Sequence, residues 1–429
     1  MTTLAIVCVG DELLDGRVVD TNARFLIEQS RKRDLQICEW RVIADDLEAI
    51  RSTLDELNDH DQIVVSGGLG PTVDDVTRQA AANFAGSELV EDRDAYGRLR
   101  RRFSDRNRRM TDNNRRQCRF PADATILPSE VGTADGFRLD HLSSQYYFFP
   151  GVPREFRWFA QKYIPAFGES ETGKSGTRLH FFGLGESDLA DRIDGIVDDA
   201  DSSGVDVGFR ADFPIIEVSI TGDESATAAI EAGIRQNVGD WLVATDDQSL
   251  SGRVGERLVE QEATVSVAES CTAGLLGAEL TRVSGSSRYF EEGYLTYSNS
   301  AKQRLLDVDA GLLERHGAVS PQVVTQMAAG ARRRASADFA LAISGIAGPT
   351  GGTDAKPVGT VDVALATPDS VFYRRSQFLK RTRRDVRILS VHVALAALLW
   401  HLEDRLDDHR FSGPHTYESI DAGIQDNRT

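Results

Sequence analysis

The sequence has few cysteines and no long apolar run, and both shortages exclude a class of protein. Its four cysteines are scattered and form no CxxC pair, which argues against a cysteine metal site or a disulfide framework and favours a reducing compartment. The apolar runs at residues 4–9 and 391–402 are shorter than the roughly 20 residues that span a bilayer, and no basic segment precedes the first. We therefore expect a cytoplasmic protein with no membrane partner.

Basic charge is also scarce. The chain has 49 Lys and Arg against 67 Asp and Glu, which gives a net charge of -18. A field of that sign repels nucleic-acid phosphates, so we expect no nucleic-acid partner. Only six of the basic residues are lysine, and the eight histidines show neither metal-ligand spacing nor a Ser-His-Asp order. Catalysis that depends on histidine is therefore not expected in the C-terminal domain.

The chain does contain enough apolar sequence for several folded domains. Hydrophobic residues make up 41% of its 429 residues, and at roughly 100–200 residues per domain this length predicts two or three domains. Strand-like runs that end in glycine-rich loops before helical patterns are typical of a parallel sheet covered on both faces. We predict an α/β fold with two three-layer α/β domains joined by a small α+β connector. The predicted boundaries are 1–170 for the first domain, 171–246 for the connector, 247–406 for the C-terminal domain and 407–429 for a mobile polar tail.

A glycine-rich loop in the first domain predicts a phosphate site. The segment GGLGPTVDDVT, residues 67–77, lies between a buried-type strand and a helix, so its backbone N–H groups can surround an anion. Asp74 and Asp75 add carboxylates that can hold a divalent metal ion such as Mg²⁺ beside that anion. The alternative is that the two aspartates only complement the dipole of the following helix. The anion-binding candidates in this loop are Gly67, Gly68, Gly70 and Thr72.

More polar residues follow the first predicted strand and belong to the same edge of the sheet. Ligands bind such sheets at the carboxyl ends of the strands, so we expect one crevice there. Residues 98–119 contain ten arginines in this acidic chain. They are typical of a solvated helix face, and the alternative is a lid whose guanidinium groups clamp a pyrophosphate. The further crevice candidates are Gly10, Asp11, Glu12 and Asn22.

The C-terminal domain has a serine where a buried strand meets a helix. In AESCTAG, residues 268–274, the oxygen of Ser270 can attack an acyl group while backbone N–H groups hold an oxyanion. Thr272 and Gly274 belong to the same turn. A helix-capping serine is the alternative, and Cys271 is a competing nucleophile, although a buried cysteine is commoner.

One of the six lysines follows in YSNSAK, residues 297–302. Lys302 can act as a desolvated base for Ser270, because lysine readily lowers its pKa when buried, and the alternative is a surface lysine. The glycine-rich segment SGIAGPTGG, residues 344–352, can wrap a phosphate or a ribose. No metal-ligand cluster accompanies these residues, so we expect this site to work without a cofactor. The candidate substrate-binding residues in SGIAGPTGG are Ser344, Gly345 and Gly348.

Taken in order, these motifs resemble the CinA family, the competence/damage-inducible proteins, over nearly the whole chain. They are GDELLDG with DTN, GGLGPTVDDVT, PGVPRE, AESCTAG, YSNSAK, GAVS, SGIAGPTGG and KPVGTV. The first domain is similar to the molybdopterin-binding domain of molybdenum-cofactor biosynthesis proteins, which in CinA relatives is associated with metal-dependent ADP-ribose pyrophosphatase activity. The last domain is similar to nicotinamide mononucleotide (NMN) deamidase, which forms nicotinic acid mononucleotide and ammonia. The pairing implies pyridine-nucleotide salvage.

The resemblance also implies roles for single residues and a homodimer. Ser270 would be the nucleophile or its positioning hydroxyl, with covalent attack and direct attack by water both compatible. Two departures stand out, because Ala273 replaces a family glycine and Asp135 a usual proline. The alternatives to a hydrolase are a molybdopterin-related nucleotide-binding or adenylyl-transfer protein, or a binding module with inactive sites. The other implied roles are proton transfer for Lys302 and Tyr297, pocket lining for Thr272, Ser344 and Gly348, and 5'-phosphate binding for Arg383 and Arg387.

Overall fold

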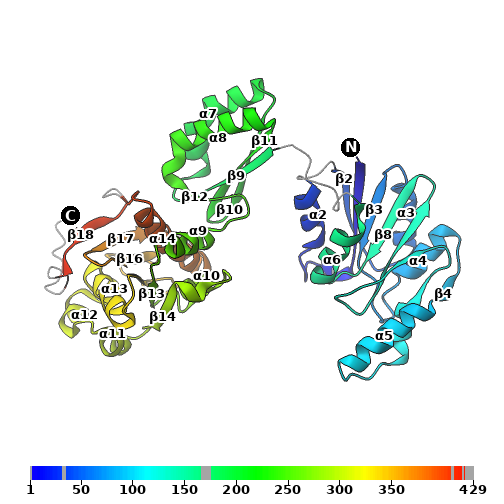
Figure 1. Cartoon of the computed structure of the whole chain (residues 1–429). Helices are drawn as coiled ribbons and strands as arrows, with labels where there is room; N and C mark the ends of the chain where they lie inside the picture. Colours follow the sequence, from blue (N-terminus) through cyan, green and yellow to red (C-terminus); the bar gives the residue numbers. More distant parts are fainter. Residues whose placement is uncertain (1, 31–34, 166–174, 407–409, 418–419, 421–429) are drawn as a thin grey trace. The chain divides into compact units, whose positions relative to one another are not determined.

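The structure, a computed structural model, describes residues 2–30, 35–165, 175–406, 410–417 and 420 (Figure 1). It contains two compact units, Met1–Lys174 and Ser175–Thr429. The second unit includes both the predicted connector and the predicted C-terminal domain. The polar joint expected around residue 171 falls mainly outside the described residues.

The first unit is built on a six-stranded sheet in the order β2-β1-β3-β8-β7-β6. The first four strands pair in parallel, whereas β7 and β6 are antiparallel additions, so the prediction of a parallel sheet holds for the part that carries the glycine-rich loop. In that order the strands are Leu35–Ile43, Thr2–Val9, Gln62–Ser66, Ser144–Phe149, Gly136–His141 and Thr125–Leu127.

Alternate residues of β1 enter two separate cores, which makes this unit three-layered. Ala5 and Val7 pack with α3, α4 and α5, whereas Leu4 and Ile6 pack with α2 and α6. This is the period-2 alternation of a strand that is buried on both faces. The bounds are α2 Asn22–Ser30, α3 Leu47–Glu56, α4 Thr77–Ala85, α5 Arg93–Asp105 and α6 Pro153–Tyr163, with a short α1 over Asp11–Leu14 and a small separate ladder of β4 Leu89–Glu91 and β5 Arg119–Pro121.

The second unit starts with the predicted α+β connector. Its antiparallel sheet has the order β10-β11-β9-β12, and α7 and α8 share one apolar core with it. The connector therefore has a hydrophobic core of its own. Its elements are β9 Ser175–Phe181, α7 Glu186–Ser202, β10 Asp206–Asp212, β11 Ile215–Gly222, α8 Glu224–Val238 and β12 Leu242–Thr245.

A second six-stranded sheet, in the order β14-β13-β15-β16-β17-β18, forms the C-terminal domain. β13 pairs in parallel with β14 and β15, and the remaining strands are antiparallel. Helices α9, α10 and α14 cover one face, and α11 to α13 cover the other. The strands are β13 Val265–Glu269, β14 Phe290–Leu295, β15 Phe339–Gly345, β16 Thr360–Ala366, β17 Val371–Gln377 and β18 Ser412–His415. The helices are α9 Leu250–Glu260, α10 Leu275–Thr281, α11 Asn299–Leu306, α12 Ala310–His316, α13 Pro321–Ala335 and α14 Arg383–Leu402.

These two sheets and the connector confirm the predicted fold class. Within the described part of the chain, α14 is the one helix long and apolar enough to cross a bilayer, but it is mostly buried as a core helix. The prediction of a mobile tail from residue 407 is wrong for the part that is described, because β18 pairs with β17. Phe411 and Ile420 are almost completely buried, and that apolar area is what holds the segment against the domain.

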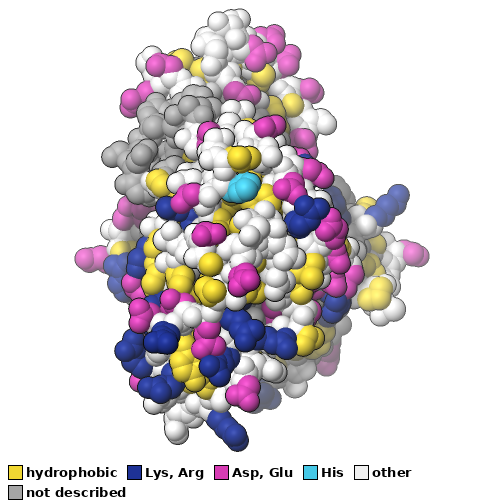
Figure 2. Space-filling view, turned by 90° about the vertical axis from the view of Figure 1, so that its right-hand side faces the viewer, with side chains coloured by type: hydrophobic (Ala, Val, Ile, Leu, Met, Phe, Trp, Pro, Cys, Tyr) yellow, Lys and Arg dark blue, Asp and Glu magenta, His cyan; other side chains and the backbone are white. Residues whose placement is uncertain are grey.

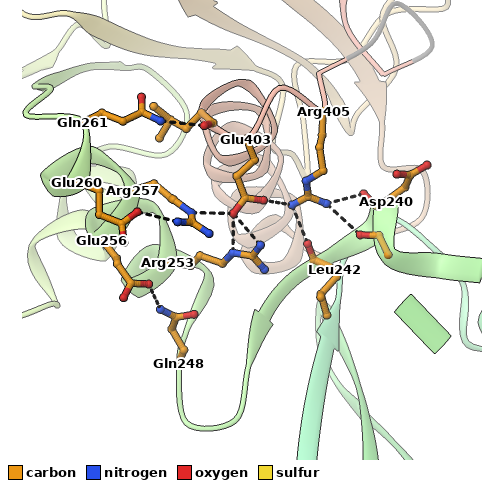
Figure 3. A network of polar contacts seen from close by, with 12 residues as sticks. Asp240, Leu242, Gln248, Arg253, Glu256, Arg257, Glu260, Gln261, Glu403 and Arg405 are labelled. Atoms are coloured by element: carbon orange, nitrogen blue, oxygen red, sulfur yellow. Dashed lines mark hydrogen bonds and ion pairs between the residues drawn. The ribbon is translucent and has the colours of Figure 1, made fainter. Parts of the chain in front are cut away.

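Glu403 links the connector to the C-terminal domain (Figure 3). Its carboxylate accepts hydrogen bonds from Arg253 at 2.8 Å and Arg257 at 3.0 Å, and it also pairs with Arg405. Arg405 in turn donates to the carbonyl oxygens of Gly239 at 3.0 Å and Leu242 at 3.1 Å in the connector. Burial opposes ionisation of Glu403, but the surrounding arginines lower its pKa overall. The carboxylate is therefore held charged at the joint of the two parts.

Candidate functional sites

In the first unit, the carboxyl ends of β1 and β3 open on a cavity of about 510 Å³. This is the place expected for a ligand site in an open α/β sheet. Glu12, Asn22, the three loop glycines and both candidate aspartates line the cavity, whereas Gly10, Asp11 and Thr72 lie beside it. Most of the residues predicted for this crevice therefore lie around one cavity.

The glycine-rich loop packs too tightly for any other residue at two positions. Gly67 has a φ of +110°, and a Cβ there would lie 2.2 Å from the carbonyl oxygen of Val9. Gly68 has a φ of +64°, and a Cβ would lie 2.0 Å from the hydroxyl of Thr77. Both glycines are needed because the loop lies directly on the end of β1 and the start of α4.

Asp75 mainly anchors this loop. Its carboxylate accepts hydrogen bonds from the backbone N–H groups of Gly70 at 2.7 Å and Thr72 at 2.8 Å and from the Thr72 hydroxyl. Asp74 is exposed at the rim. Neither aspartate caps α4, whose N-cap is Val76. The predicted metal pair is thus one loop anchor and one rim carboxylate.

Asp45 is a crevice carboxylate that the sequence analysis missed. It follows β2 and accepts a hydrogen bond from the N–H of Asp11 at 3.1 Å. Burial raises its pKa, and the nearby charges of Glu12, Asp11 and Asp75 raise it further. Its position directly after a strand that neighbours β1 was the signal available in the sequence.

These crowded carboxylates fit a divalent cation only in part. Among the described residues, no three Asp, Glu, His or Cys side chains converge on one point as a complete metal site would require. Mg²⁺ commonly uses one or two carboxylates and takes its remaining ligands from substrate phosphates and water. The crevice fits that mode, with Asp45 and Glu12 as the candidate carboxylates.

Asn22 holds the floor of the crevice together. Its amide nitrogen donates to the hydroxyl of Ser66 at 2.9 Å and to the carbonyl of Gly151 at 2.8 Å. The amide oxygen is buried and has no hydrogen-bond partner in the part of the chain that the structure describes. A buried acceptor without a donor is costly, so this oxygen is available to a donor group on a ligand.

The arginines of residues 98–119 fall into two groups. Arg98 and Arg102 on α5 bind the buried Asp135, at 2.7 Å and 3.3 Å, and Arg102 also donates to the carbonyl of Thr133. The unusual Asp135 therefore fixes the loop that lines the crevice. The remaining arginines lie mostly on the outside, and Figure 2 shows basic side chains gathered at the lower end of the first unit, where α5 lies.

In the C-terminal domain, Ser270 and Lys302 meet in a nearly dry site. Lys302 Nζ donates to Ser270 Oγ at 3.1 Å and to the carbonyl oxygen of Thr296 at 2.7 Å. Lys302 is 0% exposed and Ser270 8% exposed. Burial lowers the pKa of Lys302 to about 8, and no carboxylate of the described residues offsets this shift. A neutral amine beside a hydroxyl is the arrangement that a lysine base requires.

Tyr297 takes a different place from the one the resemblance implied. Its side chain is 65% exposed, and its contact with Lys302 runs through its carbonyl oxygen at 3.4 Å from Nζ. Proton transfer through the Tyr297 hydroxyl is therefore not supported by a contact. The tyrosine shapes the site through its backbone.

The turn after β13 leaves three N–H groups free. Glu269 is 1% exposed, and its carboxylate accepts from the N–H groups of Gly274, Leu276 and Gly277 at 2.9–3.1 Å. In the described part of the chain, the N–H groups at positions 271, 272 and 273 donate to no other residue. The helix α10 starts after Gly274, so Ser270 is not its cap. The helix-cap alternative is therefore wrong, and the turn has donors for an oxyanion.

Ala273, the residue that departs from the family glycine, has a φ of +48°. A left-handed conformation costs a residue with a Cβ about 1–2 kcal/mol. We expect Ala273→Gly to raise the free energy of unfolding by about 1 kcal/mol, measured by denaturant unfolding. Ala278→Gly, at an exposed position within α10, is the matched control and should lower it by about 1 kcal/mol. Equal effects of the two variants would contradict this explanation.

The remaining predicted residues surround this turn. Arg387 on α14 donates to the carbonyl of Thr272 at 2.6 Å, and Arg383 donates to the carbonyl of Gly348 at 2.8 Å. The first turn of α14 thus connects the two glycine-containing loops. Ser344 donates to the carbonyl of Ala318 at 2.7 Å, so its hydroxyl has a structural partner.

Two glycines of the second loop are also explained by the packing. A Cβ at Gly345 would lie 2.7 Å from Val361, and one at Gly348, which has a φ of +82°, would lie 2.5 Å from Val358. Cys271 is buried, and its burial raises its pKa to about 11. A thiol that stays protonated is a poor nucleophile, so Ser270 remains the candidate.

Known proteins match this architecture in both units. A model of the CinA C-terminal domain matches residues 247–402, and one of a probable molybdopterin binding domain matches residues 5–169. A CinA-like protein of Geobacter sulfurreducens is 41% identical over 375 residues, covering 85% of this chain and 90% of the relative. The chain belongs to the CinA family. A CinA-like protein of Shewanella sp. (strain MR-4) is 39% identical over 403 residues, covering 92% of this chain and 94% of the relative.

A solved structure of a relative is also similar in sequence to part of this chain. The competence/damage inducible protein CihA from Agrobacterium tumefaciens is 39% identical, with a TM-score of 0.35, and the match covers 36% of this chain and 93% of that one. The CinA relationship thus spans both units, as the order of the motifs predicted.

Proposed function

We propose that the C-terminal domain of this CinA-family protein is an amidohydrolase that converts NMN to nicotinic acid mononucleotide and ammonia. The observation that carries the proposal is the 3.1 Å contact between Ser270 Oγ and the buried amine of Lys302. Serine and a desolvated lysine are sufficient for acyl transfer without histidine. The family resemblance supplies the substrate.

In the proposed reaction, Ser270 Oγ attacks the carboxamide carbon while its proton passes to Lys302 Nζ. The negative charge that develops on the carboxamide oxygen is held by the free N–H groups of residues 271–273. Lys302 then returns a proton to the leaving nitrogen, ammonia departs, and water releases the acid from Ser270. Attack by a water molecule that Ser270 and Lys302 position would give the same products.

The start of α14 supports binding of the nucleotide phosphate. Arg383 is exposed and Arg387 half-buried, and both reach the loops that flank Ser270. The guanidinium fork of arginine suits a phosphate dianion, and the N-terminal end of a helix adds positive potential. Binding there would place the nicotinamide end toward the turn of Ser270.

For the first unit we propose hydrolysis of a nucleotide pyrophosphate such as ADP-ribose. The cavity at the strand ends and the glycine-rich loop support this function, and the carboxylates around Asp45 favour a divalent cation. Such an ion, when bound with the substrate, neutralises phosphate charge in a crevice that otherwise repels it. Pterin binding at the same crevice is the alternative.

One panel of substrates tests both proposals. Ammonia release from NMN should persist in EDTA, because Ser270 and Lys302 need no metal, whereas ADP-ribose cleavage should stop in EDTA and return with Mg²⁺. Loss of deamidation on chelation, with recovery on adding metal, would refute the metal-free mechanism. Tight binding of molybdopterin without ADP-ribose cleavage would favour the alternative for the first unit.

A further inference from the structure

Glu155 is a carboxyl group in the first crevice to which no role has been assigned. It lies in the first turn of α6 and lines the cavity together with Thr133 and Ala134. Among the described residues, its carboxylate has no hydrogen-bond or ion-pair partner. A side chain that is half-buried in a ligand cavity and has no partner is available to the ligand.

The position of the Glu155 carboxyl group is set by a glycine. A Cβ on the buried Gly132 would lie 2.0 Å from Glu155 Cδ, so the carboxyl group rests directly against this residue. The loop that contains Gly132 is itself fixed, because the hydroxyl of Ser129 accepts from the Gly132 N–H at 2.9 Å and Asp135 binds α5. Glu155 thus has a defined orientation without a hydrogen bond of its own.

Glu155 is influenced by nearby arginines, although the charged residues that line the cavity are acidic. All charged residues that line the cavity are acidic, and the ones besides Glu155 are Glu12, Asp20, Asp45, Asp74 and Asp75. The positive charges of Arg102, Arg106 and Arg154 favour the ionised form of Glu155, but burial outweighs them and raises its pKa. A raised pKa makes a carboxylate a stronger base, so this group is suited to accept a proton from a bound water.

We propose that Glu155 is the general base of the first unit, removing a proton from the water that attacks the phosphoanhydride. The inference rests on the hydrolase function proposed above for this crevice. The water oxygen forms a bond to one phosphorus atom, its proton passes to a Glu155 carboxylate oxygen, and the bridging P–O bond breaks. The electron pair of that bond leaves with the other phosphate, which takes up a proton from solvent.

The test is ADP-ribose hydrolysis by the full chain with Mg²⁺. Glu155→Gln should lower kcat at least about 100-fold, because general bases contribute about 10²–10⁴-fold, while KM and the Mg²⁺ concentration for half-maximal rate stay unchanged. The residual rate should also lose the decline toward low pH that protonation of Glu155 imposes. Gly132→Ala, which must push the carboxyl group aside, should give the same kcat defect.

Glu130→Gln is the matched control, since Glu130 is an exposed partner of Lys162 in the same loop region and should leave kcat unchanged. Thermal unfolding and ammonia release from NMN report whether each variant folds. If the parent hydrolyses ADP-ribose and folded Glu155→Gln keeps more than a tenth of its kcat, the role of Glu155 is refuted while the function stands. If the parent cleaves no ADP-ribose, the proposed function itself fails, and Glu155 is no base.

Discussion

Ser270→Ala should lower the rate of NMN deamidation at least about 1,000-fold while leaving the fold intact. Removal of a nucleophile abolishes the path through the covalent intermediate, and only substrate binding and the oxyanion donors remain to act on water. The hydroxyl accepts a hydrogen bond from Lys302, and the described residues make no other hydrogen bond to it. The stability of the domain should therefore change little.

Ser266→Ala is the control for this measurement. Ser266 lies in β13, which leads into the turn of Ser270; it is 0% exposed, and among the described residues its hydroxyl has no hydrogen-bond partner. Its substitution makes the same chemical change and should leave both stability and rate near those of the parent. Near-normal turnover in Ser270→Ala would show that neither the serine attack nor a serine-positioned water operates. Mass spectrometry of the parent during turnover separates those two paths, because only the first forms an acyl-enzyme.

The sequence predicted where the sites lie better than it predicted what each side chain does. Strand ends and glycine-rich loops are local patterns, so the crevice of the first unit and the turn at Ser270 could both be found. Asp75 and Tyr297 are two residues whose contacts the sequence did not predict. An aspartate two residues before a helix can bind a metal or its own loop, and only the fold shows that Asp75 accepts from Gly70 and Thr72.

Residues that come from distant segments were the hardest to predict. Asp45 and Glu155 enter the crevice from opposite ends of the first unit's sequence, and neither stands in a glycine-rich loop. The antiparallel strands β17 and β18 were also missed as a continuation of the C-terminal sheet, because β18 lies in the segment predicted to be a mobile tail. Pairing between strands depends on long-range burial, which local composition does not encode.

Replacement of Lys302 by methionine should greatly lower the rate of NMN deamidation and remove the rise of that rate with pH. A neutral amine is the base, so deamidation by the parent should rise with pH and level off above about 8, the pKa that burial gives Lys302. Lys302→Met should lower kcat about 10²–10⁴-fold and flatten that rise. Lys380→Met, at an exposed position of the same domain, should keep the parent profile.

The same lysine makes a prediction that needs no substrate. Its pKa is about 8 in the folded protein, against 10.5 for an unperturbed lysine. Between those pH values the unfolded chain holds a proton that the folded protein has lost, so the free energy of unfolding contributed by this group rises with pH across that window. Denaturant unfolding of the parent should therefore gain stability from pH 8 to 10.5 relative to Lys302→Met. An identical pH dependence of the two proteins would mean that Lys302 is charged in the folded state, and a charged Lys302 cannot take the proton of Ser270.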